Sequence, residues 1–221
     1  MKINKYIDHT LLKATATKEQ IIKLCDEAKE YNFYAVCVNG SYVELAKQEL
    51  EKSAVKIAAV IGFPLGAMTT EAKVFEAKNC IENGASEIDM VINVGKLLDG
   101  ENEYVENEIR LIKEAIGDNV LKVIFENCYL SKEQIKIASQ LAVNAGADFI
   151  KTSTGFGTGG ATFEDVQLMK DVVKDNAQIK AAGGVRDKET AEKYIEMGVT
   201  RLGTSSGVSL VTKGISDKNQ Y

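Results

Sequence analysis

The sequence is poor in histidine and lacks paired cysteines, and both scarcities limit the chemistry that it can support. Its 221 residues include one histidine, His9, and four cysteines at positions 25, 37, 80 and 128, with no CxxC pair. One histidine cannot build a centre of several histidines, so we expect no metal. A Ser-His-Asp triad would have to use His9, without the G-x-S-x-G turn that presents the serine. Isolated cysteines without an export signal predict reduced thiols in a cytoplasm.

The sequence also lacks the segments that would take it to a membrane or to nucleic acid. No apolar run approaches the roughly 20 residues of a membrane-spanning helix. The opening residues MKINKYIDHT have no apolar segment of a secretory signal. The net charge is −5, and no basic run or aromatic platform offers a surface for nucleic acid. We therefore expect a cytoplasmic protein with neither kind of partner.

What the sequence does contain is a regular alternation of short apolar runs and amphipathic stretches. It is 45% hydrophobic, which is ample material for a core. Several short runs are apolar on both parities, as expected of strands covered by helices. The predicted strands are Tyr6–Thr10, Tyr34–Val38, Ile57–Ile61, Glu87–Asn93, Lys122–Glu126, Asp148–Thr152, Gln178–Ala182 and Thr200–Thr204.

The ends of the intervening helices carry local signals. Two pairs have the capping-box spacing, Thr17 with Gln20 and Ser131 with Gln134. Glycines follow helical stretches where a left-handed residue ends a helix, at positions 84, 117, 146 and 198. Eight strands alternating with helices predict a single-domain α/β fold, a (β/α)8 TIM barrel over residues 1–221, with a polar tail from about residue 215. An open doubly wound sheet is the alternative, because about 250 residues is typical of a barrel.

Charged side chains occur in or at the ends of the predicted strands. The first strand contains Asp8 and Thr10, the fourth Asp89, the sixth Lys151 and the seventh Lys180. Barrel enzymes carry their reacting groups at the carboxyl ends of the strands, so these residues are candidates for a site at one mouth. For any one of them, a salt bridge at the rim explains the charge equally well. Four charges converging on one mouth favour a site.

Two neighbouring lysines can supply a neutral amine. Each ammonium disfavours the charged state of the other, and burial acts in the same direction. An ordinary lysine has a pKa of about 10.4, and a value of about 7 needs a shift worth about 4 kcal/mol. A neutral lysine attacks a carbonyl to form a Schiff base, and that iminium stabilises an adjacent carbanion as an enamine. Lys151 and Lys180 therefore predict the making or breaking of a carbon–carbon bond.

Two glycine-rich turns follow the seventh and eighth predicted strands. AAGGVRD contains Gly183 and Gly184, and GTSSG contains Ser205 and Ser206. In a barrel these loops frequently bind phosphate, because glycines let backbone N–H groups approach an anion and helix N-termini favour negative charge. Two ordinary strand-to-helix turns are the alternative. Their position favours a phosphorylated small-molecule substrate.

Residues 155–160, GFGTGG, also fit the dinucleotide-binding pattern G-x-G-x-x-G between a strand and a helix. That interpretation needs an acidic residue at the end of the next strand, about 20 residues on. The next strand, in QIKAAGG, ends without one, and Lys151 before the glycines would have no explanation. An NAD-dependent oxidoreductase and a non-catalytic phosphosugar-binding protein stay as alternatives, and we expect no cofactor.

Eight segments occur in the order found in one family of enzymes: IDHTLL, AVCVN, VIGFPLG, EIDMVINVG, LKVIFE, KTSTGF, KAAGGVR and GTSSG. With them the chain resembles the deoxyribose-phosphate aldolases over nearly its whole length, and KTSTGF with KAAGGVR is quite specific. The resemblance implies a class I aldolase, a carbon–carbon lyase, on a barrel fold. Such an enzyme reversibly cleaves 2-deoxy-D-ribose 5-phosphate to acetaldehyde and D-glyceraldehyde 3-phosphate through a lysine Schiff base.

The resemblance further implies roles for four residues. The lysine of KTSTG forms the Schiff base, here Lys151, and the lysine of KAAGG assists it in proton relay and by perturbing its pKa, here Lys180. The aspartate of EIDMVIN relays protons, here Asp89, and the aspartate of IDHT orients the second lysine, here Asp8. The family is often dimeric, so we expect a homodimer or a larger homo-oligomer.

The chain departs from the family at two positions, with Gly40 where VCVNP is common and Asn127 where an ET-C segment is common. Neither departure touches the lysines, and both bear on loop stiffness or substrate preference.

Some residues are weaker candidates for the substrate pocket: Thr10, Cys37, Thr152 and Phe156. A small core residue explains Cys37 equally well. Tyr221 could fold back over the site, although a free tail is the default expectation.

Overall fold

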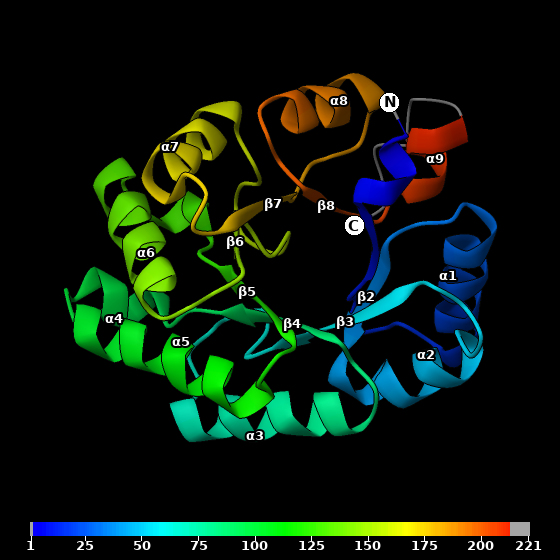
Figure 1. Ribbon diagram of the computed structural model, residues 1–221, viewed down its shortest axis with the longest axis horizontal. Coiled ribbons are helices and arrows are strands. Elements are labelled where there is room, and N and C mark those ends of the chain that lie inside the picture. Colours follow the sequence, from blue (N-terminus) through cyan, green and yellow to red (C-terminus); the bar gives the residue numbers. More distant parts are fainter. Residues whose placement is uncertain (1, 213–221) are drawn as a thin grey trace.

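Eight parallel strands close into a barrel in the computed structural model, which describes residues 2–212 (Figure 1). Each strand pairs with the next along the chain, and β1 returns to pair with β8, where Ile7 lies opposite Leu202. That last pairing excludes the open doubly wound sheet, so the predicted barrel is confirmed. The strands are β1 (Ile7–Leu11), β2 (Ala35–Asn39), β3 (Lys56–Ile61), β4 (Glu87–Val91), β5 (Val120–Ile124), β6 (Phe149–Lys151), β7 (Gln178–Ala182) and β8 (Arg201–Thr204).

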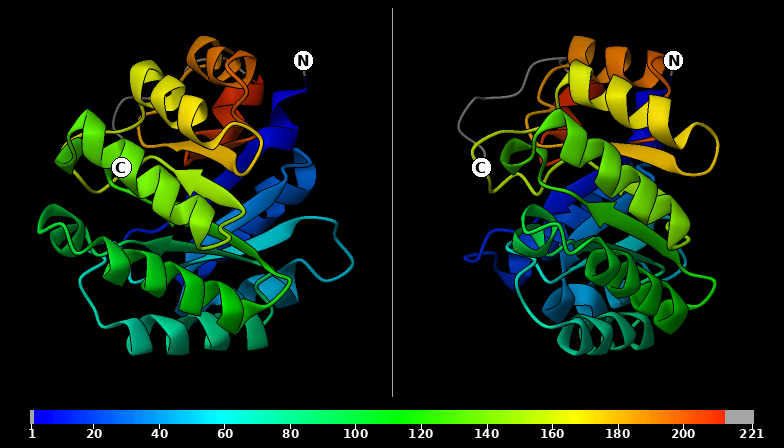
Figure 2. Two further views of the ribbon diagram at one scale, coloured as in Figure 1. Left: turned by 60° about the vertical axis from the view of Figure 1, so that its left-hand side comes forward. Right: turned by 90° about the vertical axis from the view of Figure 1, so that its left-hand side faces the viewer.

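Helices surround the strands on the outside of the ring, as the side views in Figure 2 also show. Three 3₁₀ turns interrupt the loops, at Ile3–Tyr6, Gly40–Tyr42 and Asn127–Tyr129. The helices in the described range are α1 (Lys18–Glu30), α2 (Val43–Glu49), α3 (Thr70–Glu82), α4 (Val94–Leu98), α5 (Asn102–Ile116), α6 (Lys132–Asn144), α7 (Phe163–Val173), α8 (Lys188–Glu196) and α9 (Gly207–Thr212). Tyr221 and the predicted tail lie outside the described residues.

The local signals read from the sequence operate as predicted. Both capping boxes form: Thr17 and Gln20 at the start of α1 exchange side-chain and backbone hydrogen bonds, and Ser131 and Gln134 do the same at the start of α6. A side-chain cap of this kind contributes about 1 kcal/mol. The glycines at 84, 117, 146 and 198 all have positive φ, between +59° and +117°. Every predicted strand end lies within two residues of the observed one.

The apolar core lies mainly between the strands and the helices. Outward-facing side chains such as Val36 and Ile88 belong to this shell and are fully buried. A separate small cluster inside the barrel contains Cys37, Ala58 and Val60. Much of the remaining interior is charged, so the barrel buries ionised groups where a core of this size would ordinarily hold aliphatic side chains.

No helix within residues 2–212 is long and apolar enough to span a membrane.

Candidate active site

The register of the strands places charged residues side by side inside the barrel. Lys151 on β6 lies opposite Lys180 on β7, which lies opposite Arg201 on β8. On the other side of the ring, Asp89 on β4 lies opposite Lys122 on β5. Alternate residues of a strand face the same way. We expected the charged residues at the carboxyl ends of the strands. Asp89 and Lys180 instead lie in the middle of β4 and β7.

Asp89 is the centre of the cluster. Its Oδ2 accepts hydrogen bonds from the Nζ atoms of both Lys151 and Lys180 at 2.8 Å, and its Oδ1 accepts one from Lys122 at 2.7 Å. Burial alone would raise the pKa of Asp89, but the three lysines hold that pKa well below its usual range. A single oxygen shared by two lysines also means that their nitrogens lie no more than twice 2.8 Å apart.

Asp8 holds Lys180 from the opposite side. Its Oδ2 accepts a hydrogen bond from Lys180 Nζ, and its Oδ1 accepts one from Arg201 at 2.8 Å. Burial would raise the pKa of Asp8, but Lys180, Arg201 and Lys122 lower it to about 2. With Asp8 and Asp89 both ionised beside it, the pKa of Lys180 is raised despite its burial. Lys180 thus rests as an ammonium in a fixed position, as the expected orienting role of Asp8 requires.

Three members of the cluster were missed by the sequence analysis, namely Glu87, Lys122 and Arg201. Lys122 contacts Glu87 at 2.6 Å, and Arg201 donates to both carboxylate oxygens of Glu87 at 3.0 Å. A signal for them existed, because each is a charged residue inside an otherwise apolar strand. Glu87 also shares the parity of Asp89, two residues away on β4.

Among residues 2–212, four cations inside the barrel face three carboxylates. The cations are Lys122, Lys151, Lys180 and Arg201, and the carboxylates are Asp8, Glu87 and Asp89.

Lys151 is the cation with the weakest pairing. Among the described residues it contacts the single carboxylate of Asp89, whereas Lys180 contacts two. Burial lowers the pKa of Lys151 against the attraction of Asp89, and the neighbouring Lys180 lowers it further. Of the three lysines in the cluster, Lys151 therefore releases its proton most readily, because the pKa values of Lys122 and Lys180 are raised.

Lys151 is also the member of the charged cluster that reaches a cavity at the carboxyl ends of the strands. The expected pocket residues Thr10, Phe156, Gly183 and Ser205 line it. Sequence reasoning did not single out its further lining residues: Leu11, Leu12, Lys13, Thr154, Ala182 and Gly203.

Gly203 gives the cluster the room that it needs. A Cβ at this position of β8 would lie 3.1 Å from Lys180 Cε and 2.9 Å from the Cβ of Ala182. Both distances are tighter than packed carbons adopt, so the absence of a side chain lets Lys180 pass.

Thr152 and Cys37 lie behind the pocket wall instead of lining it. The Thr152 hydroxyl donates to the carbonyl of Ala182 at 2.9 Å and accepts from its N–H at 3.1 Å, which joins β6 to β7. Thr152 does not line the cavity and its hydroxyl hydrogen is used within the fold, so a contact of Thr152 with substrate stays a prediction. Cys37 is fully buried in the barrel, and burial raises the pKa of its thiol, so it stays neutral.

The two loops predicted to bind phosphate each place one residue in the cavity wall, Gly183 and Ser205. Gly184 is exposed at φ +82° with open space around it, while Ser206 is buried and its N–H donates to Thr204 Oγ1 at 2.9 Å. The helix after the first loop does not offer a free N-terminus to an anion. Asp187 caps α8 by accepting from the Thr190 N–H at 2.8 Å. A phosphate would therefore depend on the loop backbone and side chains.

The glycines of residues 155–160 serve close packing between loops. A Cβ on Gly160 would lie 2.2 Å from the carbonyl oxygen of Gly183, and one on Gly157 would lie 2.8 Å from Cys128 Sγ. The N–H of Ala161 donates to the carbonyl of Gly183 at 3.0 Å. These contacts account for the glycine pattern without a dinucleotide.

The two departures from the family pattern sit in separate places. Gly40 begins a 3₁₀ turn after β2, where a Cβ would lie 3.1 Å from Cys80 Sγ. Asn127 is buried, and its Nδ2 donates to Met169 Sδ at 3.5 Å. Neither residue lines the cavity.

Comparison with known proteins agrees with this geometry. A model of the DeoC/LacD family of aldolases matches residues 2–213. A deoxyribose-phosphate aldolase of Geobacillus sp. is 57% identical over 218 residues, which cover 98% of each chain. A crystal structure from Coccidioides immitis, provisionally named a deoxyribose-phosphate aldolase, has a TM-score of 0.94 at 43% identity and covers 96% of this chain and 85% of that one.

A more distant relative has the same barrel. The deoxyribose phosphate aldolase of Aeropyrum pernix, described as a tetramer, has a TM-score of 0.85 at 33% identity and covers 94% of this chain and 88% of that one. With the family model matching nearly every residue and a relative identical at more than half of its positions, this chain belongs to the DeoC/LacD family of aldolases.

Proposed function

We propose that this aldolase reversibly cleaves 2-deoxy-D-ribose 5-phosphate to acetaldehyde and D-glyceraldehyde 3-phosphate, with Lys151 as the Schiff-base residue. The observation that carries the proposal is the position of Lys151. It is the member of the buried charge cluster that lines the cavity, and burial together with Lys180 lowers its pKa. A neutral amine facing a cavity beside fixed charges is what attack on a sugar aldehyde requires.

The reaction begins when the free amine of Lys151 attacks C1 of the open-chain sugar. Loss of water gives an iminium, which withdraws electrons as the C2–C3 bond breaks and leaves an enamine on Lys151. Lys180 gives its proton to the water that leaves as the iminium forms, and its amine then takes the proton of the C3 hydroxyl through a water while Asp89 stays ionised and holds it. Glyceraldehyde 3-phosphate departs. Protonation of the enamine at C2 and hydrolysis of the resulting iminium release acetaldehyde and restore the amine.

The shared oxygen of Asp89 supports the proton path. Because Oδ2 accepts from Lys151 and Lys180 at the same distance of 2.8 Å, it connects the two nitrogens that must exchange protons during a turnover. The pKa of Asp89 lies well below its usual range, so the carboxylate stays ionised and mainly holds both lysines. Lys180, with its raised pKa, is then the group that donates a proton when the bond forms in the reverse direction.

The phosphate of the substrate would bind at Gly183, Gly184, Ser205 and Ser206. Gly183 and Ser205 line the same cavity as Lys151, and Lys13 adds a cation there. Binding energy from the phosphate, remote from the reacting carbons, orients the aldehyde toward the amine.

Reductive trapping tests the proposal. Borohydride added with acetaldehyde should attach the two-carbon unit to Lys151, detected by mass spectrometry of the peptide that contains it. Lys151→Met should acquire no adduct and release no acetaldehyde from deoxyribose 5-phosphate. Lys73→Met is the matched control, because Lys73 is another buried lysine, paired with Glu108 at 2.9 Å outside the barrel. Complete trapping with unmodified Lys151 would refute the assignment.

The earlier alternatives lack support. Family membership and the packing role of the 155–160 glycines leave the NAD-dependent oxidoreductase without an observation in its favour, and a reduced-nicotinamide absorbance assay would test it. A phosphosugar-binding protein without catalysis would leave the paired lysines unexplained.

We further propose a cytoplasmic location and a homo-oligomer, no cofactor, and no nucleic-acid or membrane partner. Within residues 2–212, no group of three potential ligand side chains is placed to hold a metal. The oligomer is supported by the tetramer of the Aeropyrum pernix relative. Light scattering of the purified protein would test it.

A further inference from the structure

We propose that Arg201 and Glu87, which do not line the cavity, are positioning residues that set the charge balance of the barrel interior, so that Lys151 is the amine left without a carboxylate of its own. This inference rests on the proposed Schiff-base function of Lys151. Arg201 and Glu87 are the first residues of β8 and β4, at the amino ends of the strands and away from the cavity.

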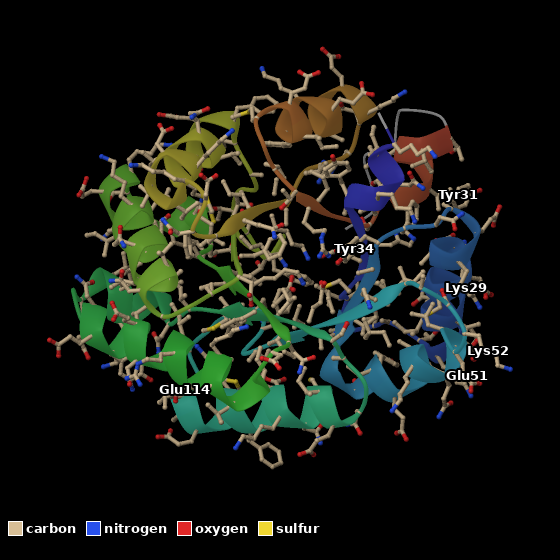
Figure 3. The ribbon with its side chains drawn as sticks, viewed as in Figure 1. Lys29, Tyr31, Tyr34, Glu51, Lys52 and Glu114 are labelled. Carbon is tan, nitrogen blue, oxygen red and sulfur yellow. The ribbon has the colours of Figure 1, made fainter. Side chains whose placement is uncertain are left out.

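Arg201 closes the barrel at the end opposite the cavity. Its guanidinium carbon lies 3.5 Å above the ring of Tyr34 and 5.3 Å from that of Phe149. Tyr34 directly precedes β2, and Figure 3 labels it at the ring of strands, inside the ring of helices. Arg201 is 4% exposed, so the ring contacts and the carboxylate contacts hold a nearly buried cation in place.

Two chains of contacts lead from Arg201 to Asp89. In one, Arg201 pairs with Glu87, which pairs with Lys122 at 2.6 Å, and Lys122 donates to Asp89 at 2.7 Å. In the other, Arg201 pairs with Asp8 at 2.8 Å, and Asp8 holds Lys180, which donates to Asp89. Both chains end on the carboxylate that Lys151 contacts.

Arg201 thereby forms ion pairs with Asp8 and Glu87, and these two carboxylates neutralise less of the charge of the lysines. The groups that face Lys151 directly are Asp89 on β4, Lys180 on β7 and the neutral thiol of Cys37 on β2. Behind them lie Asp8 on β1, Glu87 on β4, Lys122 on β5 and Arg201 on β8, and Lys13 lies at the cavity edge. Four cations and three carboxylates leave one positive charge in excess. When one lysine loses its proton, the repulsion among the remaining cations falls.

The numbers of cations and carboxylates predict opposite effects on the protonation of Lys151 when Arg201 or Glu87 is neutralised. Removing the charge of Arg201 leaves three cations and three carboxylates, so Lys151 has reason to stay protonated. Removing the charge of Glu87 leaves four cations and two carboxylates, so Lys151 should lose its proton still more readily. Removing both restores an excess of one cation. If Arg201 and Glu87 only closed this end of the barrel, all of these variants would instead lose stability or activity in the same direction.

The experiment measures borohydride trapping of acetaldehyde on Lys151 as a function of pH in Arg201→Met, Glu87→Gln and the double variant. We expect the midpoint to move upward by about one pH unit in Arg201→Met and downward in Glu87→Gln. The double variant should return to near the wild-type midpoint. At a fixed pH below the midpoint, the upward shift appears as a roughly tenfold loss of initial trapping rate.

Glu108→Gln is the matched control. It removes a carboxylate that is as buried as Glu87 and is paired with Lys73 outside the barrel, so it should leave the midpoint unchanged. Arg201→Lys keeps the charge and should do the same, and thermal unfolding of each variant verifies that it is folded. If Arg201→Met does not fold, the downward shift of Glu87→Gln against the Glu108→Gln control still decides the matter.

Shifts in the same direction, or no shift in folded Arg201→Met and Glu87→Gln, would overturn the inference while leaving the Schiff-base assignment intact. Wild-type protein that is not trapped at Lys151 at any pH would instead refute the proposed function itself.

Discussion

Replacing Lys180 with methionine removes one cation and leaves a straight side chain of similar length in the barrel. In the wild type, Lys180 and Lys151 donate to the same oxygen of Asp89, each at 2.8 Å. Lys180→Met therefore leaves Lys151 as the remaining partner of that oxygen. Lys151 should gain the pairing that it now shares and lose the neighbouring charge that lowers its pKa.

The size of the effect follows from the geometry. Two bonds to one oxygen place the lysine nitrogens roughly 5 Å apart, where two unit charges repel by about 3 kcal/mol at an effective dielectric constant of about 20. That energy corresponds to about two pH units. Lys180→Met should therefore raise the pKa of Lys151 by about two units and reduce the free amine at pH 7 by about 100-fold.

The assay is acetaldehyde release from deoxyribose 5-phosphate between pH 6 and 10, followed together with borohydride trapping. Activity of the variant should fall by at least about 100-fold at pH 7 and recover about tenfold per pH unit as the pH rises. Trapping should recover more completely than turnover, because trapping does not need Lys180 as a proton donor. A near-normal rate at pH 7, or a variant whose trapping shows no pH dependence, would refute the electrostatic account of Lys151.

Three further changes test other parts of the site. Gly203→Ala should lower kcat about 100-fold by displacing Lys180, a disturbance that Gly95→Ala in α4, whose Cβ would have a nearest contact of 3.6 Å, should not reproduce. Gly183→Ala, at φ +83°, should raise KM for deoxyribose 5-phosphate more than KM for unphosphorylated deoxyribose; equal increases would argue against a phosphate site there. Asp8→Asn should destabilise the protein by about 3–5 kcal/mol at pH 7. Because the pKa of Asp8 is lowered from 3.8 to about 2, its contribution is complete above about pH 4 and is lost as the pH falls through 2, so the difference between wild type and variant in urea unfolding should narrow by about 2 kcal/mol in acid.

Local patterns in the sequence were enough to predict the helices and strands of the fold. Capping boxes at Thr17 and Ser131, glycines with positive φ at helix ends and strands apolar on both parities all depend on residues close in the chain. Those signals predicted eight strands to within two residues of their ends. They could not decide between a barrel and an open sheet, because that choice depends on whether β1 meets β8.

The site was predicted only in part for a related reason. Lys151, Lys180, Asp89 and Asp8 were identified because each interrupts an apolar strand or belongs to a motif of the family. Sequence position also does not show that the hydroxyl of Thr152 bonds the backbone of Ala182, because the two residues meet only when β6 pairs with β7.

The sequence by itself determined that the chain alternates strands with helices and carries two lysines able to do carbonyl chemistry. Tertiary structure decided which of the two lysines has the lowered pKa. That outcome depends on contacts such as Asp8 with Arg201, separated by 193 residues in the chain and brought together when the barrel closes. Charges buried in one interior cannot each be judged alone, because the protonation of every group depends on the number and position of all the others.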